Sequence, residues 1–496
     1  MDGTATDMRI SSLVEPGVAL RTGDPATEIL SLTADSRAVA PGSLFAALPG
    51  AKTDGARFVA DAVARGAVAI LGGDGIDAPA GVAVLAAANP RQALARAAAR
   101  FHGAQPRMLC AVTGTSGKTS VAEFTRQLWA AQGRQAASLG TLGVIAPGRR
   151  VAGALTTPDP VALHAELARL AHDGVTHAAM EASSHGLDQF RLDGVALCAA
   201  AFTNLSRDHL DYHADLAAYL AAKLRLFEEL LPRGATAVAN ADDANFPAIA
   251  AIAARRGLRL VGFGRGGREL RLRARAPDGD GQILDLAIEG RDLRVRLPLA
   301  GGFQAMNALA ALGLAIGAGA DPIATAQAFA GLAGVPGRLE HVATRRCGAT
   351  VFVDYAHKPD ALRNVLETLR PHAARRLAVV FGCGGDRDPG KRPEMGAIAA
   401  SLADRVYVTD DNPRGEDPAA IRAAILVACP GATEIGARRE AIFRAVADLE
   451  AGDVLVVAGK GHETGQTAHG RTLPFDDTQV ARDAVATADA SPESGA

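Results

Sequence analysis

The stretch that most constrains this chain is residues 108–120, Met-Leu-Cys-Ala-Val-Thr-Gly-Thr-Ser-Gly-Lys-Thr-Ser, where an apolar run breaks into glycines, hydroxyls and one lysine. The run predicts a buried parallel strand over 108–112, and the apolar spacing that follows predicts a helix over 121–131. A turn between such elements aims backbone N–H groups and a helix N-terminus at an anion. The sequence therefore predicts a phosphate-binding loop in a parallel α/β sheet.

The chemistry of this loop suits a nucleoside triphosphate. Its glycines let the backbone approach phosphate oxygens, Lys118 reaches the β and γ phosphates, and the Thr119 hydroxyl can bind Mg²⁺. The spacing is not the common one, because Val112 stands where the usual pattern has its first glycine. A tight turn with an accidental Lys-Thr pair is the alternative, and the flanking strand and helix weigh against it. The predicted ATP-binding residues here are Gly114, Thr115, Ser116, Gly117, Lys118, Thr119 and Ser120.

The length of 496 residues exceeds what one hydrophobic core supports, so about three domains are expected. Turn-rich segments at 103–106 and 334–338 mark the boundaries, and the second reads as a hinge. The fold class predicted is α/β in three domains. These are a small N-terminal α/β domain (1–105), a central parallel-sheet phosphate-loop domain (106–335) and a C-terminal Rossmann-like domain (336–496).

Hydrophobic periodicity places the elements of each domain. The first domain has a predicted helix at 57–65, a strand at 67–72 and a helix at 90–101. The central domain ends in two basic alternating segments, 268–276 and 282–298, which predict a solvent-facing hairpin, followed by helices at 303–317 and 322–332. The third domain alternates strands at 350–354, 377–382, 405–409 and 453–458 with helices at 359–370, 392–403, 418–427 and 438–449, and a frayed tail is expected over 488–496.

Polar clusters follow several predicted strands. Two in the central domain, at 181–186 and 203–213, are expected to face the phosphate loop, because ligands bind at the carboxyl ends of strands in open α/β sheets. Four more lie in the third domain, at 354–359, 382–388, 410–414 and 459–463. Their Gly, Asp, Arg and Glu residues suit a zwitterionic ligand.

Charge and cysteine usage exclude several classes of function. A net charge of −2 gives no electrostatic case for nucleic acid or an anionic membrane as partner. Five cysteines without C-x-x-C spacing indicate a reducing compartment and no metal knuckle. No export signal or membrane span is expected, because the N-terminus lacks a basic region with an apolar core and the longer apolar stretches are too short. We expect a cytoplasmic monomer.

Five motifs in order carry a resemblance to a known family: Thr113–Thr119, Glu181–His185, Thr203–His213, Asp354–Pro359 and Asp411–Arg414. Together they resemble the Mur ligase family, within it the branch that adds 2,6-diaminopimelate, over nearly the whole chain. The resemblance implies a UDP-binding N-terminal domain, a central ATPase and a C-terminal amino-acid domain. It also implies an ATP-dependent amide ligase that joins meso-2,6-diaminopimelate to a UDP-N-acetylmuramoyl dipeptide in peptidoglycan precursor synthesis.

The catalytic residues implied are Lys118, Glu181, His209 and Lys223, with Mg²⁺ on Thr119, Glu181, His209 and a CO₂-derived carbamate on Lys223. Cations are needed there because phosphorylating a carboxylate brings two anions together, and two unit charges 4 Å apart repel by about 4 kcal/mol at an effective dielectric of 20. Histidine is an uncommon Mg²⁺ ligand, so the assignment of His209 as a ligand rests on the family resemblance. By itself, Lys223 would read as a snorkelling surface lysine.

The other implied residues bind the substrates. ATP is assigned Asn307, Arg338 and Asp354 besides the loop, with Gln304 and Ser116 departing from the family's usual asparagines. The UDP-muramoyl peptide is assigned Ser36, Ala51, Lys52, Thr53, Thr156, Thr157, Ser183, Gln189 and Arg191. Diaminopimelate is assigned Arg387, Asp411, Asn412, Pro413, Arg414, Gly459 and Glu463.

Three alternatives stay open. A ligase of the same family could add L-lysine, which lacks the second carboxylate that Arg414 would bind. A ligase resembling folylpolyglutamate synthase would share the ATPase centre but is not expected to have the N-terminal domain. A phosphate-loop switch protein would need neither the atypical loop nor an amino-acid pocket.

Overall fold

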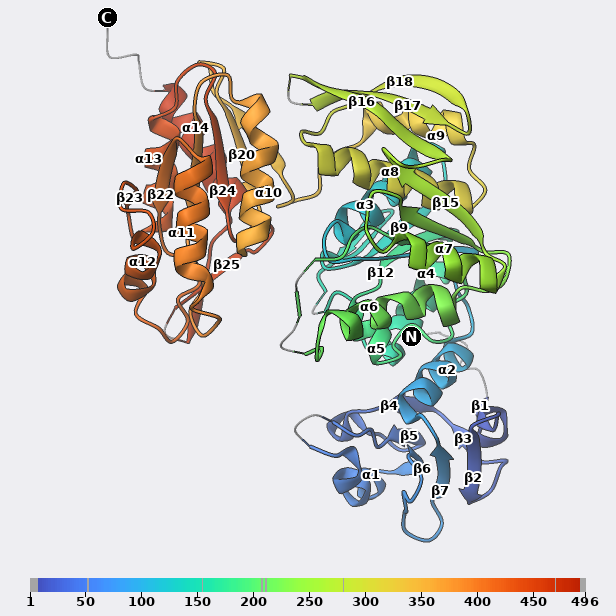
Figure 1. The fold of residues 1–496 in the computed structure, drawn as a ribbon. Helices are drawn as coiled ribbons and strands as arrows, with labels where there is room; N and C mark the ends of the chain where they lie inside the picture. Colours follow the sequence, from blue (N-terminus) through green and yellow to red (C-terminus); the bar gives the residue numbers. More distant parts are fainter. Residues whose placement is uncertain are drawn as a thin grey trace, which may run out of the picture. The chain divides into compact units, whose positions relative to one another are not determined.

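The computed structural model describes residues 8–50, 53–153, 155–206, 208–209, 212–279, 281–468 and 470–490 (Figure 1). The chain divides into two compact units, Met1–Arg271 with Leu309–Thr325 and Leu272–Ala308 with Ala326–Ala496. No helix among the described residues is long and apolar enough to cross a membrane. Three larger sheets organise the described residues, one each in the N-terminal, central and C-terminal parts.

The N-terminal sheet has the strand order β2-β7-β6-β5-β4, with only β2 antiparallel to its neighbour. Alternate residues of β5 and β6 point to opposite faces, so Leu44 and Leu71 pack on one side while Phe45 and Ile70 pack with α1 on the other. The elements are β1 Met8–Arg9, β2 Val18–Thr22, β3 Glu28–Ile29, β4 Ser31–Thr33, β5 Ser43–Ala46, α1 Val59–Ala64, β6 Ala67–Gly72, β7 Ala83–Ala87 and α2 Pro90–His102.

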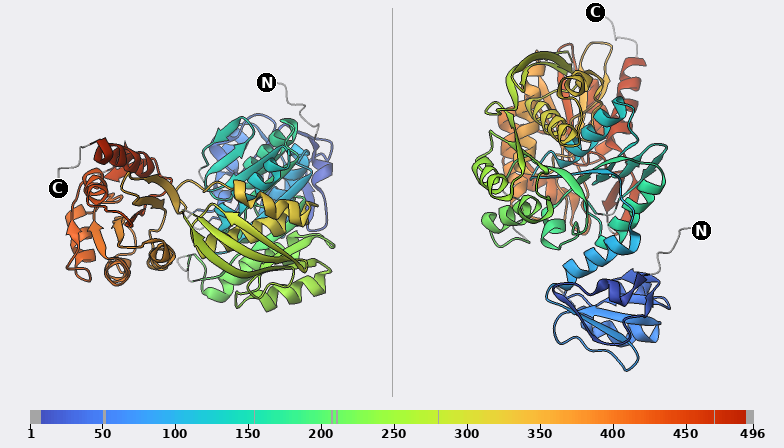
Figure 2. Two further views of the ribbon diagram at one scale, coloured as in Figure 1. Left: turned by 90° about the horizontal axis from the view of Figure 1, so that it is seen from above. Right: turned by 90° about the vertical axis from the view of Figure 1, so that its right-hand side faces the viewer.

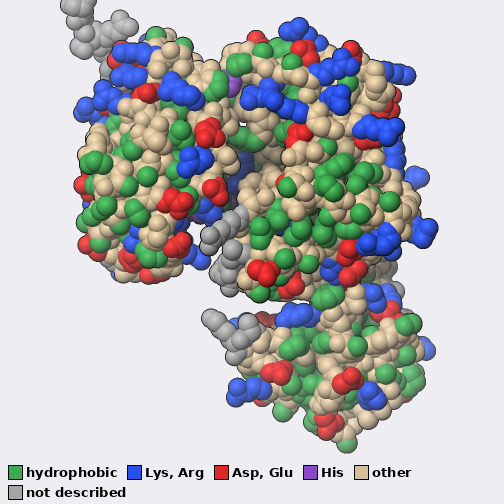
Figure 3. Space-filling view, in the orientation of Figure 1, with side chains coloured by type: hydrophobic (Ala, Val, Ile, Leu, Met, Phe, Trp, Pro, Cys, Tyr) green, Lys and Arg blue, Asp and Glu red, His purple; other side chains and the backbone are tan. Residues whose placement is uncertain are grey.

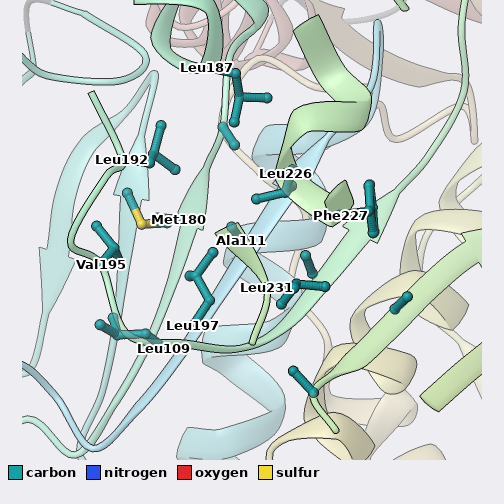
Figure 4. Packing of buried hydrophobic residues seen from close by; sticks show 14 of the residues in the cluster. Leu109, Ala111, Met180, Leu187, Leu192, Val195, Leu197, Leu226, Phe227 and Leu231 are labelled. Atoms are coloured by element: carbon teal, nitrogen blue, oxygen red, sulfur yellow. The ribbon is translucent and has the colours of Figure 1, made fainter. Parts of the chain in front are cut away.

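The central sheet has eleven strands, in the order β11-β10-β9-β12-β8-β13-β14-β15-β16-β17-β18. Its six middle strands, in the order β9-β12-β8-β13-β14-β15, are parallel, and they are mainly apolar because both faces are covered. Figure 4 shows part of one face, where Leu109, Ala111 and Met180 of the strands pack with Leu226 and Phe227.

The elements of this part follow the strand-helix alternation. They are β8 Met108–Thr113, α3 Lys118–Ala131, β9 Ala136–Gly140, β10 Gly143–Ala146, β11 Arg149–Val151, α4 Pro160–His172, β12 His177–Glu181, α5 Ser184–Asp188, β13 Leu197–Phe202, α6 Leu216–Arg225, the π-helical segment Leu226–Leu230, β14 Thr236–Asn240, α7 Phe246–Arg256, β15 Arg259–Gly264, β16 Leu270–Asp278, β17 Gly281–Ile288, β18 Arg291–Leu297, α8 Gly302–Gly317 and α9 Pro322–Gln327.

The C-terminal sheet has the order β19-β20-β24-β21-β22-β23, parallel except for β19 at its edge. Helices α10, α11 and α12 cover one face, and α13 and α14 cover the other, as the left view of Figure 2 also shows. The elements are β19 Glu340–Thr344, β20 Thr350–Asp354, α10 Pro359–Leu369, β21 Leu377–Phe381, α11 Lys391–Leu402, β22 Arg405–Val408, α12 Pro418–Leu426, β23 Thr433–Glu434, α13 Arg438–Ala447, β24 Val454–Ala458, β25 Gly465–Ala468, β26 Arg471–Pro474 and α14 Asp477–Ala490.

The predicted basic hairpin is corrected to three strands, β16, β17 and β18. The second predicted segment, 282–298, is itself a hairpin, because Glu289 and Gly290 both have positive φ (49° and 83°) and form its turn. Its solvent-facing character is confirmed: Arg273 pairs with Asp292 and Arg296 with Asp278, and Figure 3 shows basic and acidic side chains interspersed over these strands.

Other boundaries also differ from the predictions. Helix α3 begins at Lys118, three residues before the predicted start, because left-handed Gly117 (φ 88°) caps it. Residues 322–332 form α9 and then a 3-10 turn, Ala328–Gly331. The expected frayed tail is wrong for 488–490, which belong to α14, and residues 491–496 lie outside the described residues.

Candidate active site

The phosphate loop has the predicted strand-loop-helix geometry. Strand β8 leads into Gly114, whose φ of 144° is accessible to glycine alone among common residues, and Gly117 ends the loop at the N-terminus of α3. A Cβ on Gly114 would lie 1.9 Å from the Thr203 hydroxyl. The loop is therefore closed tightly over the end of β13, with the helix N-terminus at its mouth.

The polar cluster after β13 holds this loop, as expected. The Thr203 hydroxyl donates to the Ser116 carbonyl (2.6 Å), and the Ser116 N–H donates to the Asn204 side chain (3.0 Å). The Thr115 N–H donates to the Asn204 carbonyl (2.9 Å). Ser116 thus contributes through its backbone, which explains why serine is tolerated where the family usually has asparagine.

Two lysines converge on one carbonyl of the loop. The Lys118 amine donates to the Gly114 carbonyl (2.9 Å), and the Lys223 amine donates to the same oxygen (2.7 Å). Lys223 is 1% exposed, so its reading as a snorkelling surface lysine is excluded. Burial lowers the pKa of Lys223 well below its usual range, the charge of Lys118 lowers it further, and Asp208 opposes both. This environment favours a neutral Lys223 amine.

An aromatic pair, Tyr219 and His209, lies on one side of the Lys223 amine. The Tyr219 ring lies 4.3 Å from it, and the Tyr219 hydroxyl lies 3.3 Å from the Thr115 hydroxyl. His209 stacks edge-on at 6.0 Å from Tyr219 and has a left-handed backbone (φ 54°), with its Nε2 3.4 Å from Asp208. Such strain in a non-glycine residue persists only where its surroundings hold it, and it is typical of functional sites.

Glu181, at the end of β12, is 2% exposed and accepts from the Thr141 N–H (2.7 Å) and hydroxyl (3.3 Å). Within the part of the chain that the structure describes, no three His, Cys, Asp or Glu side chains group to hold a metal. Of the predicted Mg²⁺ ligands only Glu181 and His209 are of these types. The fit to the ion therefore depends on the Thr119 hydroxyl and on a second anionic group, which a carbamate on Lys223 would supply.

We expect Gly140→Ala to displace Glu181, because the added Cβ would lie 2.1 Å from its carboxylate oxygen. The expected result is a loss of roughly 10-fold or more in turnover, with a higher half-saturating Mg²⁺ concentration, measured by phosphate release. Gly73→Ala is the matched control, because nothing lies within 4 Å of its Cβ. A Gly140→Ala enzyme with wild-type Mg²⁺ dependence would contradict the role of Glu181.

The residues assigned to the muramoyl peptide form one hydrogen-bonded network. Thr157 accepts from the Ser183 N–H (3.0 Å) and donates to the Glu181 carbonyl (3.0 Å). Arg191 donates to the Thr157 carbonyl (2.6 Å) and to the Gln189 side chain (2.7 Å). The Thr156 hydroxyl lies 3.0 Å from that of Thr141, which in turn contacts Glu181. The network brings the predicted peptide residues to the predicted metal ligand.

The predicted uridine residues lie in the N-terminal domain. Ser36 begins a 3-10 turn capped by Asp35, whose carboxylate pairs with Arg37 (2.9 Å). Thr53 is exposed, while Ala51 and Lys52 lie outside the described residues.

The residues assigned to adenine and ribose are connected in the second unit. Asn307 donates to Gln304 (3.1 Å), and Gln304 donates to the Arg338 carbonyl (3.2 Å). Asp354 accepts from the Leu339 N–H (2.6 Å), and the Arg338 guanidinium lies 4.8 Å from the Tyr355 ring. Gln304 is therefore hydrogen-bonded to the residues assigned to adenine and ribose, although its side chain is longer than the asparagine usual in the family.

Nucleotide affinity should depend on the charge of Asp354. Burial raises the pKa of Asp354 to about 6, against the opposing effects of Arg338 and the Leu339 N–H. The ionised carboxylate is the better acceptor for ribose hydroxyls. ADP affinity should therefore rise between about pH 5 and pH 7, and isothermal titration with Asp354→Asn should show a smaller rise.

The stability of the protein should change with pH in the direction opposite to the ADP affinity. Between the ordinary pKa of 3.8 and about 6, folded Asp354 binds more protons than the unfolded chain does. The free energy of unfolding therefore falls as pH rises through this window, relative to Asp354→Asn. Parallel pH profiles of the two proteins would refute the assignment.

The predicted amino-acid pocket lies at the ends of β22 and β24. Asn412 donates to Glu463 (2.8 Å), and its carbonyl oxygen accepts from Lys460 (2.9 Å) and the Thr467 N–H (2.8 Å). A Cβ on Gly459 would lie 2.6 Å from the Asp411 carboxylate. Five charged or polar groups thus meet where ligands bind such sheets.

Arg414 follows Pro413 in the same loop with a left-handed backbone (φ 52°). Its N–H donates to the Thr467 carbonyl (3.0 Å) and its guanidinium to the Gly385 carbonyl (2.8 Å). Hairpin β25–β26 therefore holds this loop by its backbone. Arg387 is exposed on the loop that follows β21.

Sequence reasoning missed three residues that complete the site. Tyr219 was signalled by its spacing four residues before Lys223 on one helix. Thr141 was signalled only by its place directly after a strand. Lys460 lies within the polar cluster predicted at 459–463, but it was assigned no role, because a lysine between two glycines reads as an exposed loop residue.

Comparisons with known protein families match three segments of the chain. The descriptions are Mur ligase family, catalytic domain (residues 28–102), Mur ligase middle domain (112–315) and Mur ligase, glutamate ligase domain (337–461).

Similar curated proteins carry one name, UDP-N-acetylmuramoyl-L-alanyl-D-glutamate--2,6-diaminopimelate ligase. The one from Bradyrhizobium diazoefficiens is 55% identical over 97% of this chain and 99% of its own length. The one from Brucella melitensis is 58% identical over 91% and 92%.

Solved structures of Mur ligase family members are also similar to this chain. One with the same name has a TM-score of 0.75 at 34% identity and covers 97% of this chain and 99% of its own. A folylpolyglutamate synthase from Mycobacterium tuberculosis has a TM-score of 0.59 at 24% identity over 72% of this chain and 89% of its own, which shows the fold alone.

Proposed function

The chain belongs to the Mur ligase family, and on that premise we propose that it joins meso-2,6-diaminopimelate to UDP-N-acetylmuramoyl-L-alanyl-D-glutamate at the expense of ATP. The reaction serves peptidoglycan precursor synthesis in the cytoplasm. The observation that carries the choice of amino acid is the pocket at the ends of β22 and β24. There Asn412 donates to Glu463, and Arg414, two residues further along the same loop, donates to the Gly385 carbonyl. A cation and an anion together suit the distal carboxylate and ammonium of diaminopimelate.

The reaction begins with transfer of the γ phosphate to the carboxylate of the dipeptide. Lys118 and the N–H groups of the phosphate loop stabilise the charge that gathers on the transferred group. The amine of diaminopimelate then attacks the acyl phosphate, and phosphate leaves. Thr157, Ser183 and Arg191 orient the muramoyl peptide beside Glu181.

Thr119, Glu181 and His209 would hold Mg²⁺, which supplies charge compensation between the two anions. We propose that Lys223 completes this set as a carbamate formed from its neutral amine and CO₂. The shared Gly114 carbonyl supports this, because it brings the two side chains together, and a carbamate would place a negative charge beside the Lys118 ammonium.

The remaining assignments are proposals of the same kind. Asn307, Arg338 and Asp354 hold adenine and ribose, and Ser36, Ala51, Lys52 and Thr53 hold the uridine diphosphate. The domain limits are 1–105, 106–335 and 336–496, and the protein is a monomer, which light scattering with size-exclusion chromatography tests.

The test of the function is ATP-dependent phosphate release with the UDP-muramoyl dipeptide and each amino acid in turn. We expect release with meso-diaminopimelate, far less with L-lysine, and none without an amino acid. Equal rates with lysine would favour the lysine-adding alternative. Release with folate and glutamate in place of these substrates would favour a folylpolyglutamate synthase.

A further inference from the structure

Lys460 is fully buried at the end of β24, with a side-chain exposure of 0%. A lysine is almost never buried without partners, because removing an ammonium from water is costly. Its partners are all residues of the amino-acid pocket: Asn412 at 2.9 Å, Glu463 at 3.5 Å and Asp411 at 3.9 Å.

The contact with Asn412 fixes the direction of that amide. The Asn412 oxygen accepts from both Lys460 and the Thr467 N–H, so its NH₂ group must point at Glu463, to which it donates at 2.8 Å. A reversed amide would set donors against an ammonium and an N–H. The orientation of Glu463 is therefore set indirectly by Lys460.

The ammonium also balances the charge of the pocket. Burial lowers the pKa of Lys460, whereas Asp411 and Glu463 raise it. The buried ion pair of Arg438 and Asp477 lies close by and is neutral as a pair: Arg438 donates to the carbonyls of Ala458 (2.9 Å) and Asp410 (3.4 Å). With Lys460 charged, the two carboxylates Asp411 and Glu463 leave one net negative charge to meet a ligand ammonium.

We propose that Lys460 is a positioning residue for the incoming amino acid, which aligns Asn412 and Glu463 on the ammonium of the ligand without touching it. The inference rests on the proposed function of this pocket. It assigns Lys460 an effect on amino-acid binding alone, since its partners Asn412, Asp411 and Glu463 all lie outside the ATP and muramoyl-peptide sets.

The test is Lys460→Met, which keeps the length of the side chain and removes the charge. We expect KM for diaminopimelate to rise roughly 10-fold or more, with kcat changed less than about 3-fold and KM for ATP unchanged. Arg376→Met is the matched control. It removes a cation that pairs with buried Asp453 (2.7 Å) at the opposite ends of the same strands, so it should lower stability and leave every KM unchanged.

A double-mutant cycle with Glu463→Gln separates positioning from a general structural role. If Lys460 acts through Glu463, the two changes in KM are not additive, whereas a purely structural lysine gives additive changes. Lys460→Gln, which keeps a donor for the Asn412 oxygen, should restore part of the affinity and serves if the methionine variant does not fold.

An unchanged KM for diaminopimelate in Lys460→Met, equal rises in the KM of all three substrates, or an additive cycle would overturn the inference. The proposed function is judged separately on the wild-type protein. If the wild type uses a different amino acid, the same KM comparison is made with that amino acid.

Discussion

Lys223→Ala is expected to lower turnover by roughly 10³-fold, the largest effect of any substitution in the central domain. The buried amine donates to the Gly114 carbonyl beside Lys118, and burial lowers its pKa, which favours the neutral form that reacts with CO₂. Removing this amine would remove the proposed carbamate, one of the anionic groups assigned to Mg²⁺. Phosphate release under steady-state conditions measures the loss.

Short-chain carboxylates provide the decisive control. Formate or acetate should partly restore Lys223→Ala, because a free carboxylate can enter the space that the side chain leaves. Lys223→Arg should stay inactive with or without them, since it fills that space and cannot form a carbamate. If no carboxylate rescues the alanine variant and CO₂ depletion leaves the wild-type rate intact, Lys223 does not act as a carbamate.

The fold could be predicted largely because its strands are buried on both faces. A run such as Met108–Thr113 has no polar alternation, so its length and flanking glycines identify it. The three-part α/β fold class is confirmed, as is the family. The hairpins β10–β11 and β25–β26 were missed, because strands of three or four residues that are half-buried (β10, β25) or largely exposed (β11, β26) carry no clear hydrophobic pattern.

The parts of the site whose residues lie together in one continuous stretch of sequence could be predicted. The loop Gly114–Thr119 and the cluster after β13 lie at strand ends, and the structure brings them together. The cluster at 459–463 also lies at a predicted strand end, but the burial of Lys460 and its contact with Asn412 could not be predicted, because they depend on residues distant along the chain. The roles of Arg387 and of the nucleotide-sugar residues stay predictions.

Arg414→Ala is expected to lower kcat/KM for diaminopimelate by about 10²-fold and to leave ATP binding unchanged. Diaminopimelate differs from lysine by one carboxylate, and truncating the partner of a buried charge costs about 2–5 kcal/mol. The contacts of Arg414 in the structure fit this role. Its left-handed backbone is held by Thr467, and its guanidinium uses one donor on Gly385 and presents a planar fork for the rest.

Two variants sharpen this measurement. Arg414→Lys keeps the charge but loses the bidentate geometry, so its kcat/KM should lie between those of the wild type and the alanine variant. Arg444→Ala is the matched control, because it removes an exposed arginine that pairs with Asp448 one helical turn away, and such pairs contribute little. The ratio of diaminopimelate to lysine use should fall toward one in Arg414→Ala only. An Arg414→Ala enzyme that keeps this ratio would place the second carboxylate of the substrate elsewhere in the pocket, and Arg387 on the neighbouring loop would be the next cation to test.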